Sequence, residues 1–328
     1  MTGIDSNPGA SWQSFDSPEA AGWNDAGVAR LHEVLASQNS DCLMVVQGGR
    51  IVFTHGDITH KFLCYSIRKS FLAAMIGEDV AAGLIALNAT MASLDIDDHD
   101  PLIWVEREAT VHDLLMARSG IYHPAGYETE WMQLIREKRH SHAPGTFWCY
   151  NNWDFNALGT IFTQRTGLSV AEAFASRIAE PLGMQDFSLA GDRPDVWTEP
   201  FEVSRHPAYP FRMNSRDLAR FGQPFLQAGR WSGRRVLPEG KCHALFRRRA
   251  PRRLWLLLMA RARRPLRARC TDAAGSCAAQ GAGGHYCMVI PELDMVLVHR
   301  VDTDQKGRAI RKHEFGYVRK PALKAARS

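Results

Sequence analysis

The chain has no run of apolar residues long enough to cross a membrane. The longest apolar run in its strongly basic region, residues 254–260, has seven members, whereas a helical span needs about 20. The first residues also lack the basic and apolar segments of a secretion signal. We therefore expect a soluble, cytoplasmic protein without a membrane span.

Metal-binding patterns are also missing. The seven cysteines are odd in number and include no Cys-x-x-Cys pair, which suits a reducing compartment and provides no zinc framework. The His-x-His string at 140–142 and the acidic string at 97–100 have no further ligands at a spacing that completes a coordination shell. The sequence therefore predicts no metal and no cofactor.

One segment contains no acidic residue, and it determines the net charge. Residues 247–269 include ten arginines, without which the formal charge of +5 would become −5. Three interpretations remain open for this segment: a patch for nucleic acid or another anionic surface, an insertion, or a stretch translated in a shifted reading frame. We favour the frame shift, because the composition changes abruptly to arginine, alanine, leucine and proline, and we expect no nucleic-acid partner.

The order of strand and helix patterns predicts an α+β fold. Apolar runs at 42–54 and 285–300, each broken by a turn, indicate a hairpin near either end of the chain. Helical patterns dominate from 66 to about 228. We therefore expect both chain ends to share one antiparallel sheet, flanked by helices, beside an inserted all-helical lobe.

We expect one two-lobed domain, because the sequence has no internal repeat and no long linker. Residues 1–20, rich in Ser, Gly, Asp and Pro, are expected to form a flexible N-terminal arm. The expected parts of the domain 21–328 are a sheet lobe (about 40–85 and 276–328), a helical lobe (about 86–240) and the anomalous arginine-rich segment 244–275. The sequence predicts no oligomeric state.

Ser66 and Lys69 open an apolar, helix-like run that ends at Gly83. A serine hydroxyl is a weak nucleophile until a neighbour takes its proton, and a lysine of depressed pKa can do so. Three residues apart on a helix, the two side chains share a face, and the helix N-terminus favours a developing oxyanion. An isolated Ser-x-x-Lys pair is more often an N-cap and a solvated lysine.

A second string, Tyr150-Asn151-Asn152, lies 84 residues after Ser66 and changes that balance. A phenol can exchange a proton with a serine hydroxyl, and the Asn152 amide can hold a substrate carbonyl or a lysine. Together the two strings predict a serine hydrolase whose base is not histidine.

Four strings in this order resemble the serine β-lactamase-related, penicillin-binding-protein-like family, which includes class C β-lactamases, D-alanyl-D-alanine peptidases, esterases and nylon-oligomer amidases. The resemblance implies a β-lactamase/transpeptidase-like fold and hydrolysis through an acyl-enzyme. It implies that Ser66 is the nucleophile, Lys69 its proton partner, Tyr150 the general acid and base, and Asn152 a substrate-positioning residue. The strings are residues 65–70 (YSIRKS), 111–121 (VHDLLMARSGI), 144–152 (PGTFWCYNN) and 181–184 (PLGM).

The chain departs from the family in two places. The family's third motif usually starts with Lys or His, whereas here it is Ala279-Gln280-Gly281. The missing cation argues against a penicillin-type substrate and for a small neutral ester or amide. The resemblance also implies an oxyanion hole made by the backbone N–H groups of Ser66 and Ala282.

The arginine-rich segment interrupts the similarity, which resumes near Gly281 in the same register. If this segment is out of frame, the family sequence that leads into the third motif is lost and activity is impaired. Two alternatives to the hydrolase remain open, a catalytically inactive binding protein of the same fold and a basic interaction module.

Overall fold

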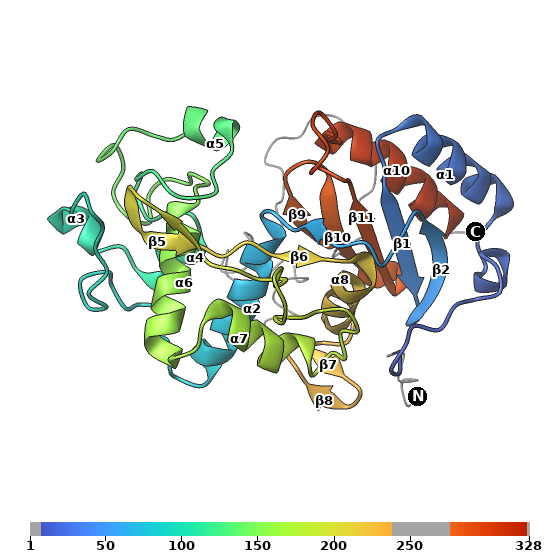
Figure 1. Ribbon diagram of the computed structural model, residues 1–328, viewed down its shortest axis with the longest axis horizontal. Coiled ribbons are helices and arrows are strands. Elements are labelled where there is room, and N and C mark those ends of the chain that lie inside the picture. Colours follow the sequence, from blue (N-terminus) through green and yellow to red (C-terminus); the bar gives the residue numbers. More distant parts are fainter. Residues whose placement is uncertain (1–7, 238–275, 327–328) are drawn as a thin grey trace.

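The computed structural model describes residues 8–237 and 276–326 (Figure 1). The first seven residues and the whole of the arginine-rich segment 244–275 lie outside the described residues, so its three interpretations stay predictions. Within the described ranges, every helix is too short or too polar to cross a bilayer.

Both ends of the chain contribute to one five-stranded antiparallel sheet, which confirms the predicted fold class. The strand order is β2-β1-β11-β10-β9, and every neighbouring pair is antiparallel. The two predicted hairpins are β1–β2 and β10–β11, and the pairing of β1 with β11 joins them at the centre of the sheet. The strands are β1 (Cys42–Gln47), β2 (Arg50–His55), β9 (Cys277–Gly281), β10 (His285–Ile290) and β11 (Met295–Arg300).

Helices cover both faces of this sheet, so its central strands are buried except at Gln47, the half-buried last residue of β1. Alternate side chains of β1 point to opposite faces, as strand geometry requires. Leu43 and Val45 pack into the core beneath α1 (Asp25–Ser37) and α10 (Lys312–Ala325). Met44 and Val46 pack into the larger core shared with α2 (Ile67–Ala81) and α8 (Ser215–Gly222). Helix α2 therefore lies where the sheet meets the second lobe (Figure 1).

The second lobe is mainly helical and also contains short strands. Its strands form three separate pairs, β3 with β6, β4 with β5, and β7 with β8. Its helices are α3 (Trp104–Arg107), α4 (Val111–Leu115), α5 (Glu130–Leu134), α6 (Trp153–Thr166) and α7 (Val170–Phe174), and its strands are β3 (Phe62–Leu63), β4 (Glu199–Phe201), β5 (Ser204–Ala208), β6 (Arg212–Met213), β7 (Arg230–Trp231) and β8 (Arg234–Arg235). Short 3-10 or π turns complete the fold at Glu19–Ala21, Ala175–Ala179, Gln223–Phe225 and Pro291–Leu293.

The described part of the N-terminal arm lies along the edge strand β2. Phe15 N donates to the carbonyl of Ile51, and Ile51 N donates to that of Gln13. The Arg50 guanidinium lies 4.1 Å from the centre of the Phe15 ring, and the Trp12 indole donates to the carbonyl of Arg216. These contacts hold the arm in place from Trp12 to Phe15. The two aromatic side chains at its ends make contacts that the polar residues between them do not.

Candidate active site

Ser66 stands at the N-terminus of α2 with its hydroxyl unused for capping. Its φ and ψ of −71° and −8° are helical, and its side chain makes no capping hydrogen bond. An ordinary N-cap serine has extended backbone and binds an N–H of the first turn, so this geometry differs from a purely structural serine. Tyr65, just before it, has a φ of +46°, a left-handed conformation that costs free energy in a bulky residue.

Lys69 is one turn further on and is buried, with 3% of its surface exposed. Its Nζ lies 3.2 Å from Ser66 Oγ, 2.6 Å from Tyr150 Oη and 2.6 Å from Asn152 Oδ1. Tyr150 and Asn152 come from the loop that leads into α6, 81 and 83 residues away. The structure therefore brings the four predicted side chains together around one amine.

The Asn152 amide is fully engaged inside the protein. Its oxygen accepts from Lys69, and its Nδ2 donates to the carbonyls of Gly126 and Tyr127 at 3.2 and 2.6 Å. With 1% of the residue exposed, no N–H of this amide is directed at a substrate. The role expected for it, positioning of the substrate, therefore becomes the positioning of Lys69 in our assignment.

Burial has opposite effects on the two proton-exchanging groups. It disfavours the ammonium and, together with the nearby Arg68 charge, holds the pKa of Lys69 well below its ordinary value. It also disfavours the phenolate and raises the pKa of Tyr150, although the Ser66 hydrogen bond and Arg68 act in the other direction. Burial therefore favours the neutral form of both groups, the amine and the phenol.

The end of β9 lies against the residues just before Ser66. A Cβ atom on Gly281 would stand 2.6 Å from the carbonyl oxygen of Cys64 and 3.3 Å from Tyr65 Cβ, which leaves room only for glycine. Ala282 follows as the first residue of the turn between β9 and β10. Its backbone therefore lies near the start of α2, and its role in an oxyanion hole stays a prediction.

Among the described residues, neither Ala279 nor His285 provides the cation that is missing from the third motif. Ala279 is buried on β9 and contributes a methyl group. His285 is also buried, and its Nδ1 accepts a hydrogen bond of 3.1 Å from Arg300 Nε. Burial and the Arg300 charge hold the pKa of His285 well below its ordinary value. The imidazole is therefore neutral and cannot replace a lysine ammonium.

Sequence reasoning missed two residues that support the site, Tyr127 and Glu128. Tyr127 has a φ of +66°, stacks on Tyr65 with ring centres 6.1 Å apart, and offers the carbonyl that holds Asn152. Glu128 pairs with Arg136, and burial raises the pKa of its carboxyl. Tyr127 contacts Tyr65 and Asn152, and the Glu128 charge acts to raise the pKa of Lys69. These partners are distant in sequence, so no local pattern identifies either residue.

The acidic string is structural. Asp98 is buried and accepts from the Trp153 indole, the Ser204 hydroxyl and the Arg205 N–H at 2.6, 2.8 and 2.7 Å. It thereby fixes the start of α6, directly after Asn152. Within the described ranges, no cluster of three or more His, Cys, Asp or Glu side chains is placed to bind a metal ion.

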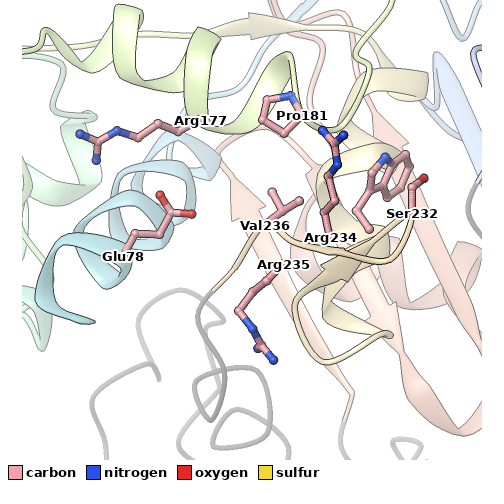
Figure 2. Close-up of a pocket in the computed structure, with 8 residues that line it drawn as sticks. Glu78, Arg177, Pro181, Ser232, Arg234, Arg235 and Val236 are labelled. Carbon is pink, nitrogen blue, oxygen red and sulfur yellow. The ribbon is translucent and has the colours of Figure 1, made fainter. Parts of the chain in front are cut away.

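A cavity of about 600 Å³ lies elsewhere, near the other end of α2 (Figure 2). It is lined by residues that include Glu78, Arg177, Trp231 and Arg234. Glu78 comes 12 residues after Ser66, which corresponds to about 18 Å along a helix. This cavity is therefore separate from the Ser66 site.

An antiparallel sheet built from both chain ends, next to a helical lobe with a half-buried serine and a buried lysine in a Ser-x-x-Lys pair at the seam, defines the β-lactamase and penicillin-binding class of serine hydrolases. The family model described as Beta-lactamase matches residues 29–314, and the chain belongs to this family.

Individual relatives are distant. A D-aminopeptidase of Brucella anthropi is 28% identical over 141 residues, which are 39% of this chain and only 26% of that protein. A protein of Bacillus anthracis assigned as a 6-aminohexanoate-dimer hydrolase has a similar structure, with a TM-score of 0.66, 19% identity, and coverage of 90% of this chain and 81% of that one. EstCE1, a hydrolase with promiscuous acyltransferase activity, gives a TM-score of 0.63 at 13% identity, with coverage of 90% and 98%.

Proposed function

We propose that the protein is a serine hydrolase that forms an acyl-enzyme on Ser66 and cleaves a small neutral ester or amide. The observation that carries this proposal is the position of the Lys69 amine, within 3.2 Å of the Ser66 hydroxyl and 2.6 Å of the Tyr150 phenol. A buried neutral amine beside a hydroxyl is the arrangement that activates a serine nucleophile without histidine.

In our mechanism the proton of Ser66 ends on Lys69. One N–H of the amine donates to Asn152 Oδ1, and its lone pair takes the serine proton directly or through Tyr150. The resemblance gave Tyr150 the part of general base. Because burial raises the pKa of this phenol, we assign it instead to passing the proton between Ser66, Lys69 and the leaving group.

The proposed acylation step begins at the Ser66 hydroxyl. Ser66 Oγ adds to the substrate carbonyl carbon, and the carbonyl oxygen becomes an oxyanion that the N–H groups of Ser66 and Ala282 stabilise. The bond to the leaving group breaks as Tyr150 delivers a proton to it, and an ester of Ser66 remains. A water molecule gives its proton to the same pair of groups, attacks this ester, releases the acid and restores the serine.

A neutral substrate is supported by the absence of a cation at Ala279 and by the neutral His285. In the family, the cation of the third motif helps to bind a substrate carboxylate. The similar proteins named above include a D-aminopeptidase, an assigned amide hydrolase and a hydrolase with acyltransferase activity. They agree with ester or amide hydrolysis as the class of reaction.

A fluorophosphonate probe tests the nucleophile. We expect it to attach one phosphonyl group to Ser66, detected by peptide mass spectrometry, and to leave Ser66→Ala unlabelled. Ser176→Ala removes an exposed hydroxyl from the second lobe and should label as the wild type does. A folded wild-type protein that takes up no probe would support the inactive binding protein instead.

A substrate panel tests the predicted neutral specificity. We expect hydrolysis of p-nitrophenyl esters of short acids or of a D-amino-acid anilide, and no hydrolysis of a chromogenic cephalosporin, because the site offers no third-motif cation to the cephalosporin carboxylate. Release of chromophore measures all three, with Ser66→Ala as the blank. Turnover of the cephalosporin alone would contradict the proposed substrate class.

A further inference from the structure

Arg68 precedes Lys69 in the sequence Ser66-Ile67-Arg68-Lys69. It is fully buried, with 0% of its surface exposed. Its Nη2 donates to Asn156 Oδ1 at 2.9 Å, whereas Nε and Nη1 have no hydrogen-bond partner among residues 8–237 and 276–326. The guanidinium lies 4.3 Å from the centre of the Tyr209 ring and 5.7 Å from that of Tyr127. In the described part of the chain, no carboxylate comes within ion-pair distance of it.

Such a side chain is costly for folding. A buried charge is usually paired with an opposite charge or fully hydrogen-bonded, and an apolar residue of similar volume is often the more stable choice. The aromatic rings recover part of this cost through cation–π attraction. Two unsatisfied nitrogens remain, so the arrangement is better explained by an effect on its surroundings than by stability.

Two neighbouring carboxyl groups, Glu128 and Asp154, act on Lys69 in the direction opposite to Arg68, each less strongly than Arg68 does. Glu128 is already paired with Arg136. Asp154 is buried with its Oδ2 unpartnered, and burial raises the pKa of its carboxyl to about 8, so it is mainly uncharged at neutral pH. The other groups that face Lys69 and Arg68 are the phenols of Tyr127, Tyr150 and Tyr209, whose pKa values burial raises.

We propose that Arg68 is a positioning residue for the proton: its buried guanidinium, which has no ion-pair partner in the described part of the chain, disfavours a second positive charge on the adjacent Lys69 and so keeps that amine ready to accept the proton of Ser66. This inference rests on the proposed function. In this inference Arg68, a residue of α2, supplies a positive charge beside the proton-exchanging groups. The third motif does not supply one, because its first position is Ala279.

The test is the pH dependence of the reaction in Arg68→Gln. Fluorophosphonate labelling rates and kcat/KM for the best ester should rise with pH as Lys69 loses its proton. Removing a like charge raises the pKa of the remaining group, so the midpoint of that rise should move up by about one pH unit. Arg68→Lys, which keeps the charge, should move it much less.

Arg220→Gln is the matched control. Arg220 is also buried on a helix, donates to the carbonyls of Leu182, Gly9 and Ala10, and lies 5.5 Å from the centres of two tryptophan rings. Removing its charge should alter thermal stability but not the midpoint. If Arg68→Gln does not fold, Arg68→Met replaces the guanidinium by an apolar chain and should give the same upward shift. An unchanged midpoint in a folded Arg68 variant would overturn the inference.

A direct titration separates this inference from the proposed function. The amine of Lys69 can be followed by NMR in ¹⁵N-lysine-labelled protein, assigned by its loss in Lys69→Ala. A depressed midpoint in the wild type that rises in Arg68→Gln supports the role of Arg68 even if no probe or ester reacts. Equal midpoints in the two proteins would refute it even if Ser66 is labelled.

Discussion

Lys69→Ala should lower kcat/KM for the best ester by about 10²–10⁴-fold, the usual contribution of a general acid–base group. The variant leaves Ser66 and Tyr150 in place but removes the amine between them, to which we assign the serine proton. Tyr150 cannot replace it, because burial raises the pKa of its phenol. Initial rates at several pH values measure the loss, and fluorophosphonate labelling should slow by a similar factor.

The control for this loss is Lys324→Ala, a surface substitution near the end of α10. It should leave the rate unchanged. Tyr150→Phe should also slow turnover, since it removes the hydroxyl that passes the proton to the leaving group. Thermal unfolding must show that Lys69→Ala retains its fold, as expected when a costly buried amine is removed. Near-native rates in folded Lys69→Ala would exclude the lysine as the base.

The sequence predicted this part of the site because its geometry is local. Ser66 and Lys69 lie one helical turn apart, and an apolar run ending in glycine is enough to place them on a helix. Tyr150 and Asn152 were chosen for the chemistry of a phenol and an amide and for the family resemblance, since nothing in the spacing of 84 residues indicates contact. The orientation of the Asn152 amide depends on the carbonyls of Gly126 and Tyr127. No sequence pattern predicts where these carbonyls lie.

The burial of Arg68 could not be predicted from the sequence either. This residue stands in the Ser-Ile-Arg-Lys string, where an arginine beside a lysine is normally solvated. Its burial follows from Tyr127, Tyr209 and Asn156, three residues brought in by the fold of the second lobe. A sequence shows which residues are charged. It does not show whether a charge is buried, because burial depends on packing between residues that are distant in the sequence.

For the fold, continuous apolar runs broken by turns were sufficient for the two hairpins of the main sheet. The short pair of β4 and β5 was not predicted. Its residues, Glu199–Phe201 and Ser204–Ala208, include prolines, a histidine and several polar groups, and such composition resembles a loop. Asp98, which binds the Ser204 hydroxyl and the Arg205 N–H, supplies an anchor for this hairpin that strand propensity does not.

Gly281→Ala should lower kcat by about 10²–10³-fold, the typical cost of losing one donor of an oxyanion hole. The added methyl group would meet the Cys64 carbonyl oxygen at 2.6 Å, a distance that real structures avoid. The end of β9 must then move away from Tyr65 and Ser66, taking the Ala282 N–H with it. Lys69 and Tyr150 stay in place, so the pH dependence of the remaining activity should be unchanged.

Gly316→Ala provides the matched control for this substitution. Gly316 lies inside α10 and a Cβ there would meet no atom within 4 Å, so the change should leave turnover intact and favour the helix slightly. The comparison separates a local displacement at the strand edge from a general effect of replacing glycine. If folded Gly281→Ala kept native kcat, the strand edge would not supply an oxyanion donor, and the second N–H would have to come from another part of the chain.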